Sequence, residues 1–472
     1  MRAQLSRPAL RPGAVAARRP QLTFWALAAV GVVLLAPLVT RPTYALLLPL
    51  GLIAVWLAWR SPAIPLALGG IPPLVDAVAG SDPFPKGGFT LLFSAWIALG
   101  VGFVIMRGTH RVALRALLSI PVLASCFLLG WMVFRLGSSP DQLYGSMKLQ
   151  LYVADVLVFF LASIFVGSRR SDLQLFFLVL LGVTAISSLV FLVQLVGGEA
   201  QQAISGRFSL ATQEYPIDLG RASADGLLVA IYFLLSADRR SLRVPVALVT
   251  PVMAIAMIAA GSRGPVVAFV VGLAALLALS ATSSRARRRF AFVGVVFALV
   301  AIVVPLVVPS TTIGRALSTI VGSASGLSSN GRSDLWSIAI ASFSQHFAVG
   351  LGTGGFASLP TSVSVGILYP HNLFLEVASE LGIIGLVAIL VIVGGLVVRL
   401  AGLWRSTVDE DRLVATILIA LFLTALTNAC FSEAIYGNAE VWIWGGLAIG
   451  MGAQMSQELP APRWRGASAR AG

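Results

Sequence analysis

Long apolar runs alternate with short polar connections along most of this chain. Each run approaches the roughly 20 residues that a helix needs to cross the ~30 Å hydrocarbon core of a bilayer. Read with a window of about 19 residues, the pattern predicts an all-α fold, a single polytopic transmembrane helical bundle of about 12 to 14 spans. The predicted spans are 22–40, 43–59, 62–79, 88–106, 112–134, 146–166, 173–196, 222–237, 242–260, 264–282, 290–308, 372–398, 413–430 and 434–456.

The polar and apolar positions divide the chain into three parts. Residues 1–21 are an Arg-rich N-terminus, 22–456 form one transmembrane domain, and 457–472 are a C-terminal tail. The run 22–40 lacks a small-x-small cleavage site, so we predict a retained span rather than a signal peptide. The span 62–79 contains Pro65, Pro72, Pro73 and Asp76, which predicts a bent or re-entrant segment.

Composition agrees with a lipid-embedded protein. A soluble domain carries about 25% charged residues, whereas here 11% are charged and 58% are hydrophobic. The formal net charge of +14 would fit a nucleic-acid partner, but its distribution along the chain argues for membrane topology instead. We therefore expect membrane lipids, and no nucleic acid, as partners.

The positively charged residues predict which loops are cytoplasmic. If the N-terminus is inside, most of the 33 Lys and Arg fall in inner loops, as the positive-inside rule requires. The two long connections, 197–221 and 309–371, then lie on the outer face. The cations left on that face are Arg41, Lys86, Arg135, Lys148, Arg207, Arg221, Arg263, Arg315 and Arg332.

The loop 309–371 has structure of its own. Trp336, Ile340, Phe343 and Phe347 follow helical spacing, which predicts a short amphipathic helix. Such a helix either lies in the lipid headgroups or packs on the bundle. Arg332 at its start either holds a phosphate or anchors the helix at the interface.

A glycine run and a histidine follow this helix. Glycine-rich turns can bring backbone amides to phosphate, but the run from Gly350 to Gly355 lacks a Walker lysine, so we predict a tight turn. His371 opens a helix in which Asn372, Glu376 and Glu380 share one face. Carboxylates inside a span are costly and usually face a partner or a cavity. Together with Arg332, we therefore predict Asn372, Glu376 and Glu380 as substrate-binding residues. The alternatives are helix capping for Asn372 and a structural ion pair for Glu380.

Arginines upstream are candidate phosphate ligands. Arg263 lies between two apolar helices with almost no loop, and Arg207 and Arg221 lie in or beside the first long outer loop. The planar guanidinium can donate two parallel hydrogen bonds to a phosphate. The alternative for Arg263 is a side chain that snorkels to the interface.

In combination, these motifs resemble the O-antigen ligase and O-antigen polymerase superfamily of bacterial envelope glycosyltransferases. The residues that carry the resemblance are Ser262-Arg263-Gly264, Gly331-Arg332, Leu335-Trp336, Gly350-x-Gly352-x-Gly354, His371-Asn372 and Glu380-x-Gly382-x-x-Gly385.

The resemblance implies a multi-pass protein of the bacterial cytoplasmic membrane with its active site on the extracytoplasmic side. The expected donor is an undecaprenyl-diphosphate-linked glycan, and the acceptor is a lipid- or glycan-linked hydroxyl. The resemblance implies His371 as the catalytic histidine, Arg263 and Arg207 as arginines that handle the diphosphate, with Arg221 as a substitute for Arg207, and no metal or other cofactor.

Chemistry agrees with this expectation. Arginines can stabilise the charge of a diphosphate leaving group, and a neutral histidine can take the acceptor's proton. Direct displacement would invert the anomeric centre. Ligase and polymerase differ only in the acceptor, so both readings stay open. A transporter or flippase of lipid-linked saccharide is the alternative from another class, because it would use the same bundle and arginines.

Overall fold

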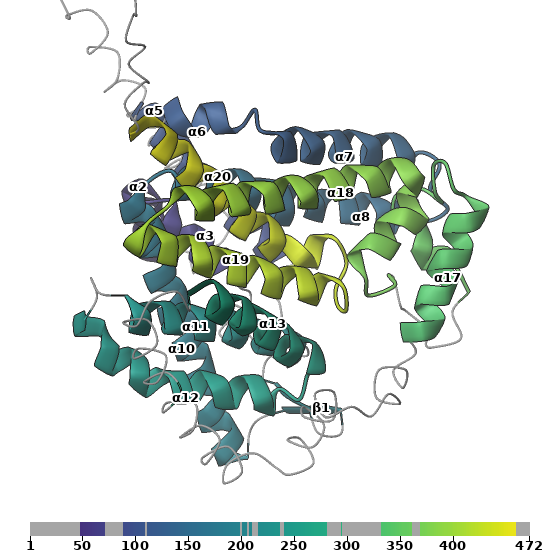
Figure 1. Ribbon diagram of the computed structural model, residues 1–472. Helices are drawn as coiled ribbons and strands as arrows, with labels where there is room; N and C mark the ends of the chain where they lie inside the picture. The colour runs from purple at the N-terminus through teal and green to yellow at the C-terminus, as the bar shows by residue number, and fades with distance from the viewer. Residues whose placement is uncertain are drawn as a thin grey trace, which may run out of the picture.

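A computed structural model of the protein describes most of the bundle. The described residues are 48–70, 88–108, 111–198, 201–204, 207–209, 216–236, 240–280, 294, 332–360 and 369–458. Within them the chain is almost entirely helical, and the helices pack side by side (Figure 1). A short antiparallel hairpin of β1 (Gln201–Ile204) and β2 (Arg207–Ser209) is added to the bundle. The predicted all-α, polytopic fold is confirmed.

The helices form two neighbouring groups. In Figure 1, α10 to α13 lie below α18 to α20, and α19 joins the groups by packing on α13 and α20. α7 runs alongside α18 over much of its length. The helices are α2 (Leu48–Arg60), α3 (Ala63–Gly69), α5 (Gly88–Met106), α6 (Arg111–Ala116), α7 (Ile120–Leu136), α8 (Gln142–Leu151), α9 (Phe159–Gly167), α10 (Arg170–Gly197), α11 (Pro216–Leu235), α12 (Arg243–Ala259), α13 (Arg263–Ser280), α17 (Arg332–Gln345), α18 (Leu373–Ser406), α19 (Asp409–Ala429) and α20 (Ala439–Glu458).

Several helices can cross a bilayer unaided. By length and composition these are Gln142–Gly167, in which a π-helical turn joins α8 to α9, and α10, α13, α18 and α19. α2 and α3 meet at a bend of 118°, so together they make one broken span or a re-entrant loop. The bend falls between Arg60 and Ala63, and α3 continues through Pro65. Pro72, Pro73 and Asp76, on which the predicted irregularity of 62–79 also rested, lie outside the described residues.

One predicted span is wrong in its details. The range 112–134 is not a single helix, because α6 ends at Ala116 and α7 begins at Ile120. Pro121 explains the break: proline has no N–H to continue a helix, but it fits the first turn of a new one. The predicted spans 22–40 and 290–308 lie outside the described residues.

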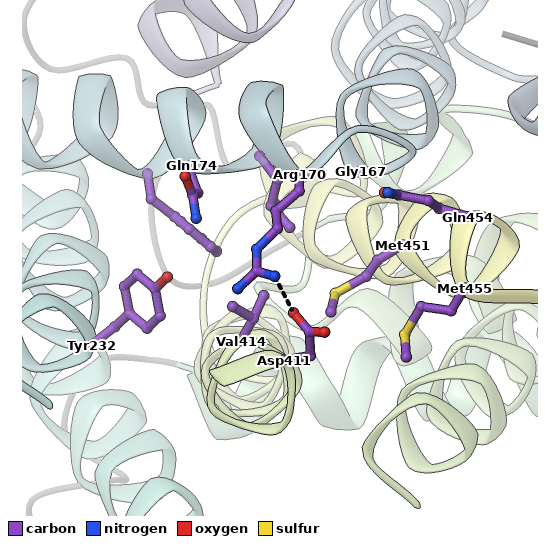
Figure 2. A pocket seen from close by; sticks show the side chains of 11 residues that line it. Gly167, Arg170, Gln174, Tyr232, Asp411, Val414, Met451, Gln454 and Met455 are labelled. Carbon is purple, nitrogen blue, oxygen red and sulfur yellow. Dashed lines mark ion pairs between the residues drawn. The ribbon is translucent and has the colours of Figure 1, made fainter. Parts of the chain in front are cut away.

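Loops predicted to be cytoplasmic meet at one end of the bundle. There Arg243 donates to the carbonyl of Ser236 at 2.9 Å, and the Ser236 hydroxyl lies 3.2 Å from Glu410. Arg170 reaches Asp411 at 3.4 Å, beside a pocket of about 100 Å³ that Tyr232, Gln174 and two methionines also line (Figure 2). These contacts join the start of α10, the end of α11 and the start of α19.

The predicted amphipathic helix is α17, which packs against α18. Leu335, Ala339 and Ser342 form its buried face, whereas Ile340 and Phe347 of the predicted apolar stripe are more than half exposed. Trp336 of the same stripe packs on the bundle, where its ring nitrogen donates to the carbonyl of Pro370 at 3.0 Å and its ring lies beside Phe431. The stripe is therefore divided between a contact with the bundle and exposed apolar side chains, and the second part suits a membrane surface.

Candidate functional site

Asn372 fixes the position of His371 at the start of α18. The side-chain oxygen of Asn372 accepts hydrogen bonds from the amides of Phe374 (3.0 Å) and Leu375 (3.1 Å), which would otherwise lack a partner in the first turn. Its side-chain nitrogen donates to the carbonyl of Cys430 at 3.0 Å. Asn372 therefore caps the helix, and His371 lies at the positive end of the helix dipole.

His371 is held in an unusual environment. Its backbone has a positive φ of 55°, and its ring lies edge-on to Tyr369 with ring centroids 4.7 Å apart. Burial, followed by the positive charge of Arg332, lowers the pKa of His371 to about 4. Its Nδ1 is buried and has no hydrogen-bond partner among the described residues. The imidazole is therefore neutral at pH 7 and can accept a proton.

Charged groups from separate parts of the chain surround this histidine. Arg332, at the start of α17, interacts electrostatically with Glu433, Arg263 and Tyr369. Burial, and then the neighbouring Arg263, lower the pKa of Arg332 against the opposing effect of Glu433. The Tyr369 hydroxyl donates to Glu433 at 3.3 Å, and burial raises the pKa of that carboxyl. Arg332 thus lies close to a buried carboxyl, a neutral histidine and a second arginine, Arg263.

Arg221 lies near the same carboxyl but is held by other groups. Its guanidinium donates to Glu440 at 2.9 Å and to Asn438 at 3.3 Å, both at the start of α20. Arg221 is 3% exposed, and its charge also acts on Glu433. Arg221 therefore links α11 to α20 beside Glu433. We call the group of Arg263, Arg332, Tyr369, His371 and Glu433 the His371 cluster.

Glu376 and Glu380 are paired with a lysine that sequence reasoning had not linked to them. Lys148 of α8 lies 2.5 Å from Glu376 and 2.7 Å from Glu380, and all three side chains are buried. Glu376 also accepts from the amide of Ile435 at 2.9 Å, and Glu380 accepts from the amide of Gly354 at 2.9 Å. Glu380 therefore forms the structural ion pair that was the alternative to substrate binding, and Glu376 forms one with the same lysine.

The glycine run is a tight turn that packs against a break in α18. Gly382 has φ 66° and ψ −162°, which interrupts the helix. A Cβ on Gly350 would lie 2.3 Å from the backbone carbon of Glu380, and one on Gly382 would lie 2.6 Å from Ala348. Gly350, Gly352 and Gly354 all have positive φ. Only glycines allow this close contact, so the run positions the start of α18.

Arg135 holds the same turn from the side of α7. Its guanidinium donates to the carbonyls of Val349 and Gly350, both at 3.0 Å. Arg135 and Lys148, two of the cations predicted to lie on the outer face, thus have structural partners, whereas Arg332 acts on His371 and Arg263 acts on Arg332. Arg207 lies in β2, and its side chain is outside the described residues.

The sequence alone does not predict the site contacts of Lys148, Tyr369, Glu433 and Glu440. Tyr369 precedes Pro370, Glu433 lies in the short connection between α19 and α20, and Glu440 lies in the first turn of α20. No local pattern relates these residues to arginines more than 100 positions away. Their importance follows from the packing of α11, α13, α17 and α20 around one point.

Fold and site together define a polytopic helical membrane protein with a neutral histidine among arginines at one end of its bundle. Residues 246–390 match the family model described as O-antigen ligase. The match includes Arg263, Arg332, His371, Asn372 and the glycine turn, and it confirms the predicted resemblance to the O-antigen ligase and polymerase superfamily. This family implies a glycosyltransferase-type enzyme of the bacterial envelope. No curated protein matches the chain.

Proposed function

We propose that the protein transfers a glycan from an undecaprenyl-diphosphate carrier to an acceptor hydroxyl, on the outer face of the bacterial cytoplasmic membrane. The observation that carries this proposal is the His371 cluster, in which the charge of Arg332 acts on a neutral imidazole and a second arginine, Arg263, lies near Arg332. The family match supports a reaction of this class.

Arginines supply the donor side of the reaction. A glycosyl diphosphate is already activated, and its leaving group gains negative charge as the bond between the anomeric carbon and the phosphate oxygen breaks. Arg263 and Arg332 repel each other, so a dianionic diphosphate between them would relieve this repulsion. Because the fold holds both guanidinium groups in place before the substrate binds, they can stabilise the charge on the leaving group with little movement of the protein. In this proposal no metal ion is required, and Arg207 and Arg221 take supporting roles toward the diphosphate.

His371 supplies the acceptor side. The acceptor oxygen forms a bond to the anomeric carbon as the diphosphate leaves, and the hydroxyl proton passes to His371. A single displacement of this kind inverts the anomeric centre. Asn372 holds the histidine in place, and Glu376 and Glu380, through Lys148 and Gly354, hold the start of α18 against the glycine turn.

The test is transfer by purified protein from a lipid-linked donor to an acceptor, read as a larger glycan on a gel. We expect His371→Ala to lower the rate by about 10² to 10⁴, the usual contribution of a general base. His346→Ala is the matched control, because His346 is exposed at the end of α17. Near-normal transfer by His371→Ala would exclude this role.

The same assay separates the other readings. A lipid-linked saccharide transporter would yield no covalent product with any acceptor. A polymerase would extend a second lipid-linked glycan, and a ligase would use a lipid-core acceptor instead. We favour the ligase reading, because the matching family model carries that description.

A further inference from the structure

A long groove runs between α7 and α18, away from the His371 cluster. Its apolar part has a volume of about 590 Å³. Leu123 and Phe127 line it from α7, and Ile383, Val387 and Val391 line it from α18. Phe127 and Val387 are more than half exposed, so these walls are open at the side. A groove of this kind in a bilayer is filled by lipid chains.

The groove continues into a polar end. A second volume of about 980 Å³ shares Ile120 and Val391 with the first, so the two parts are continuous. Arg115 and Arg399 both line it and are exposed, and no acidic residue lines it. Neither arginine has an ion pair among the described residues. The polar end therefore has positive charge that nothing in the described part of the chain compensates.

Ser119 adds an independent observation. It lines the polar end and is 7% exposed, yet its hydroxyl has no hydrogen-bond partner among the described residues. Ser119 is also the N-cap of α7, but its side chain does not cap the helix. A buried hydroxyl without a partner destabilises the folded protein, so a ligand oxygen that accepts from Ser119 would remove that penalty.

The floor of the polar end is open. No atom lies within 4 Å of the position that a Cβ would take on Gly394, Gly402 or Gly452, and all three line the groove. From Arg399 to Ile384 the groove follows α18 for about 22 Å at 1.5 Å per residue. One leaflet is about 15 Å deep, half of the ~30 Å hydrocarbon thickness. The groove is therefore long enough for an acyl chain to span one leaflet.

We propose that this groove binds one anionic glycerophospholipid of the bilayer. Its phosphate lies among Arg115, Ser119 and Arg399, and an acyl chain follows α7 and α18 toward Ile383. The site lies at the opposite end of α18 from His371, so it is separate from the proposed transfer site. By the positive-inside count it faces the cytoplasmic leaflet, where anionic headgroups attract arginines.

The C-terminal segment after α20 is a poorer occupant. It begins beside Ser456 and Gln457, which line the groove, but it carries Arg463, Arg465 and Arg470 and no acid after Glu458. Its charge opposes that of Arg115 and Arg399. The anionic lipid satisfies the charge, the hydroxyl and the apolar walls together.

The test uses full-length protein purified in mild detergent and given phosphatidylglycerol or phosphatidylethanolamine. Bound lipid is then counted by native mass spectrometry. We expect a preference for phosphatidylglycerol that falls about fivefold for each arginine removed, or on the order of 25-fold in Arg115→Ala/Arg399→Ala. Arg405→Ala is the control, because it removes an exposed arginine of α18 that does not line the groove.

A second pair of variants tests the apolar path without changing charge. Gly394→Leu fills the groove and should lower retention of phosphatidylglycerol, whereas Gly130→Leu, equally open but outside the groove, should not. Equal retention by Arg115→Ala/Arg399→Ala and Arg405→Ala would overturn the proposal. So would a polyprenyl phosphate as the co-purified lipid, or undiminished binding in Gly394→Leu.

Discussion

At the scale of single residues, burial keeps the imidazole of His371 neutral, and a neighbouring cation adds to the effect. Burial is the main reason that the pKa of His371 falls to about 4, and Arg332 adds to it. The base form of His371 is therefore present at all pH values above about 4. Arg332 would then do two things at once, because it would also attract the diphosphate.

The pH profile of transfer tests this coupling. For the native protein, we expect kcat/KM to be flat from pH 8 to pH 5 and to fall only near pH 4, as His371 becomes protonated. In Arg332→Gln one cause of the lowered pKa is gone, so the acid limb moves up toward 6.5, the ordinary value for histidine. The measurement is kcat/KM against pH for both proteins. An acid limb at the same pH in both would contradict the coupling.

A second residue-scale prediction concerns Lys148. Lys148→Met leaves Glu376 and Glu380 buried without their cation, and loss of one partner from a buried ion pair costs about 3–5 kcal/mol. We expect a clear drop in the thermal unfolding temperature of the detergent-solubilised protein.

The matched control for Lys148 removes all three charges. Lys148→Met/Glu376→Gln/Glu380→Gln should recover part of the lost stability, because neutral side chains avoid the penalty of unpaired carboxylates. If Lys148→Met unfolded at the native temperature, the ion triad would not contribute to the stability of the bundle.

At the scale of elements, apolar periodicity predicts the helices well but not their contacts. The long helices α10 and α13 begin and end within a few residues of their predicted limits, because bilayer thickness sets their length. The sequence does not reveal that α8 supplies the cation for two carboxylates of α18, because Lys148 and Glu380 are 232 residues apart. Nor does it show the break at Gly382, since glycine is common within membrane helices.

The break in α18 gives an element-scale prediction. In Gly382→Ala the side chain must enter a backbone region that costs about 1–3 kcal/mol for other residues, and it also meets the backbone of Ala348. We expect lower thermal stability and reduced transfer, because the glycine turn would shift away from the start of α18. Gly394→Ala on the same helix meets no atom within 4 Å and is the control. It should be neutral or stabilising by up to about 1 kcal/mol. Equal stability of the two variants would show that the turn tolerates a displaced break.

At the scale of the whole molecule, the charges of the loops and the chemistry of the site divide between the two ends of the bundle. Arg170 and Arg243 lie with the starts of α10, α12 and α19, whereas Arg263, Arg332 and His371 lie at the starts of α13, α17 and α18. The positive-inside count predicts this division, because successive loops of a membrane protein lie alternately on the two sides of the bilayer. The gathering of Arg263, Arg332 and Glu433 at one point depends on packing, and no count of charges reveals it.

The division predicts opposite sides of the membrane for the two ends. In a background of Cys126→Ser/Cys430→Ser, which removes both native cysteines, we expect Ser344→Cys on α17 to react in intact cells with a maleimide that does not cross membranes. Ser406→Cys at the end of α18 should react only after the cells are permeabilised, since the positive-inside rule keeps that end in the cytoplasm. Both side chains are exposed at helix ends. Because Ser406 also lines the lipid groove, its labelling in permeabilised cells is the reference for its labelling in intact cells, and the difference reports the side of the membrane. Labelling of Ser406→Cys in intact cells, with protection of Ser344→Cys, would place the His371 cluster in the cytoplasm. There a lipid-linked donor would have to react before it crosses the membrane, and the proposed outer-face transfer would be ruled out.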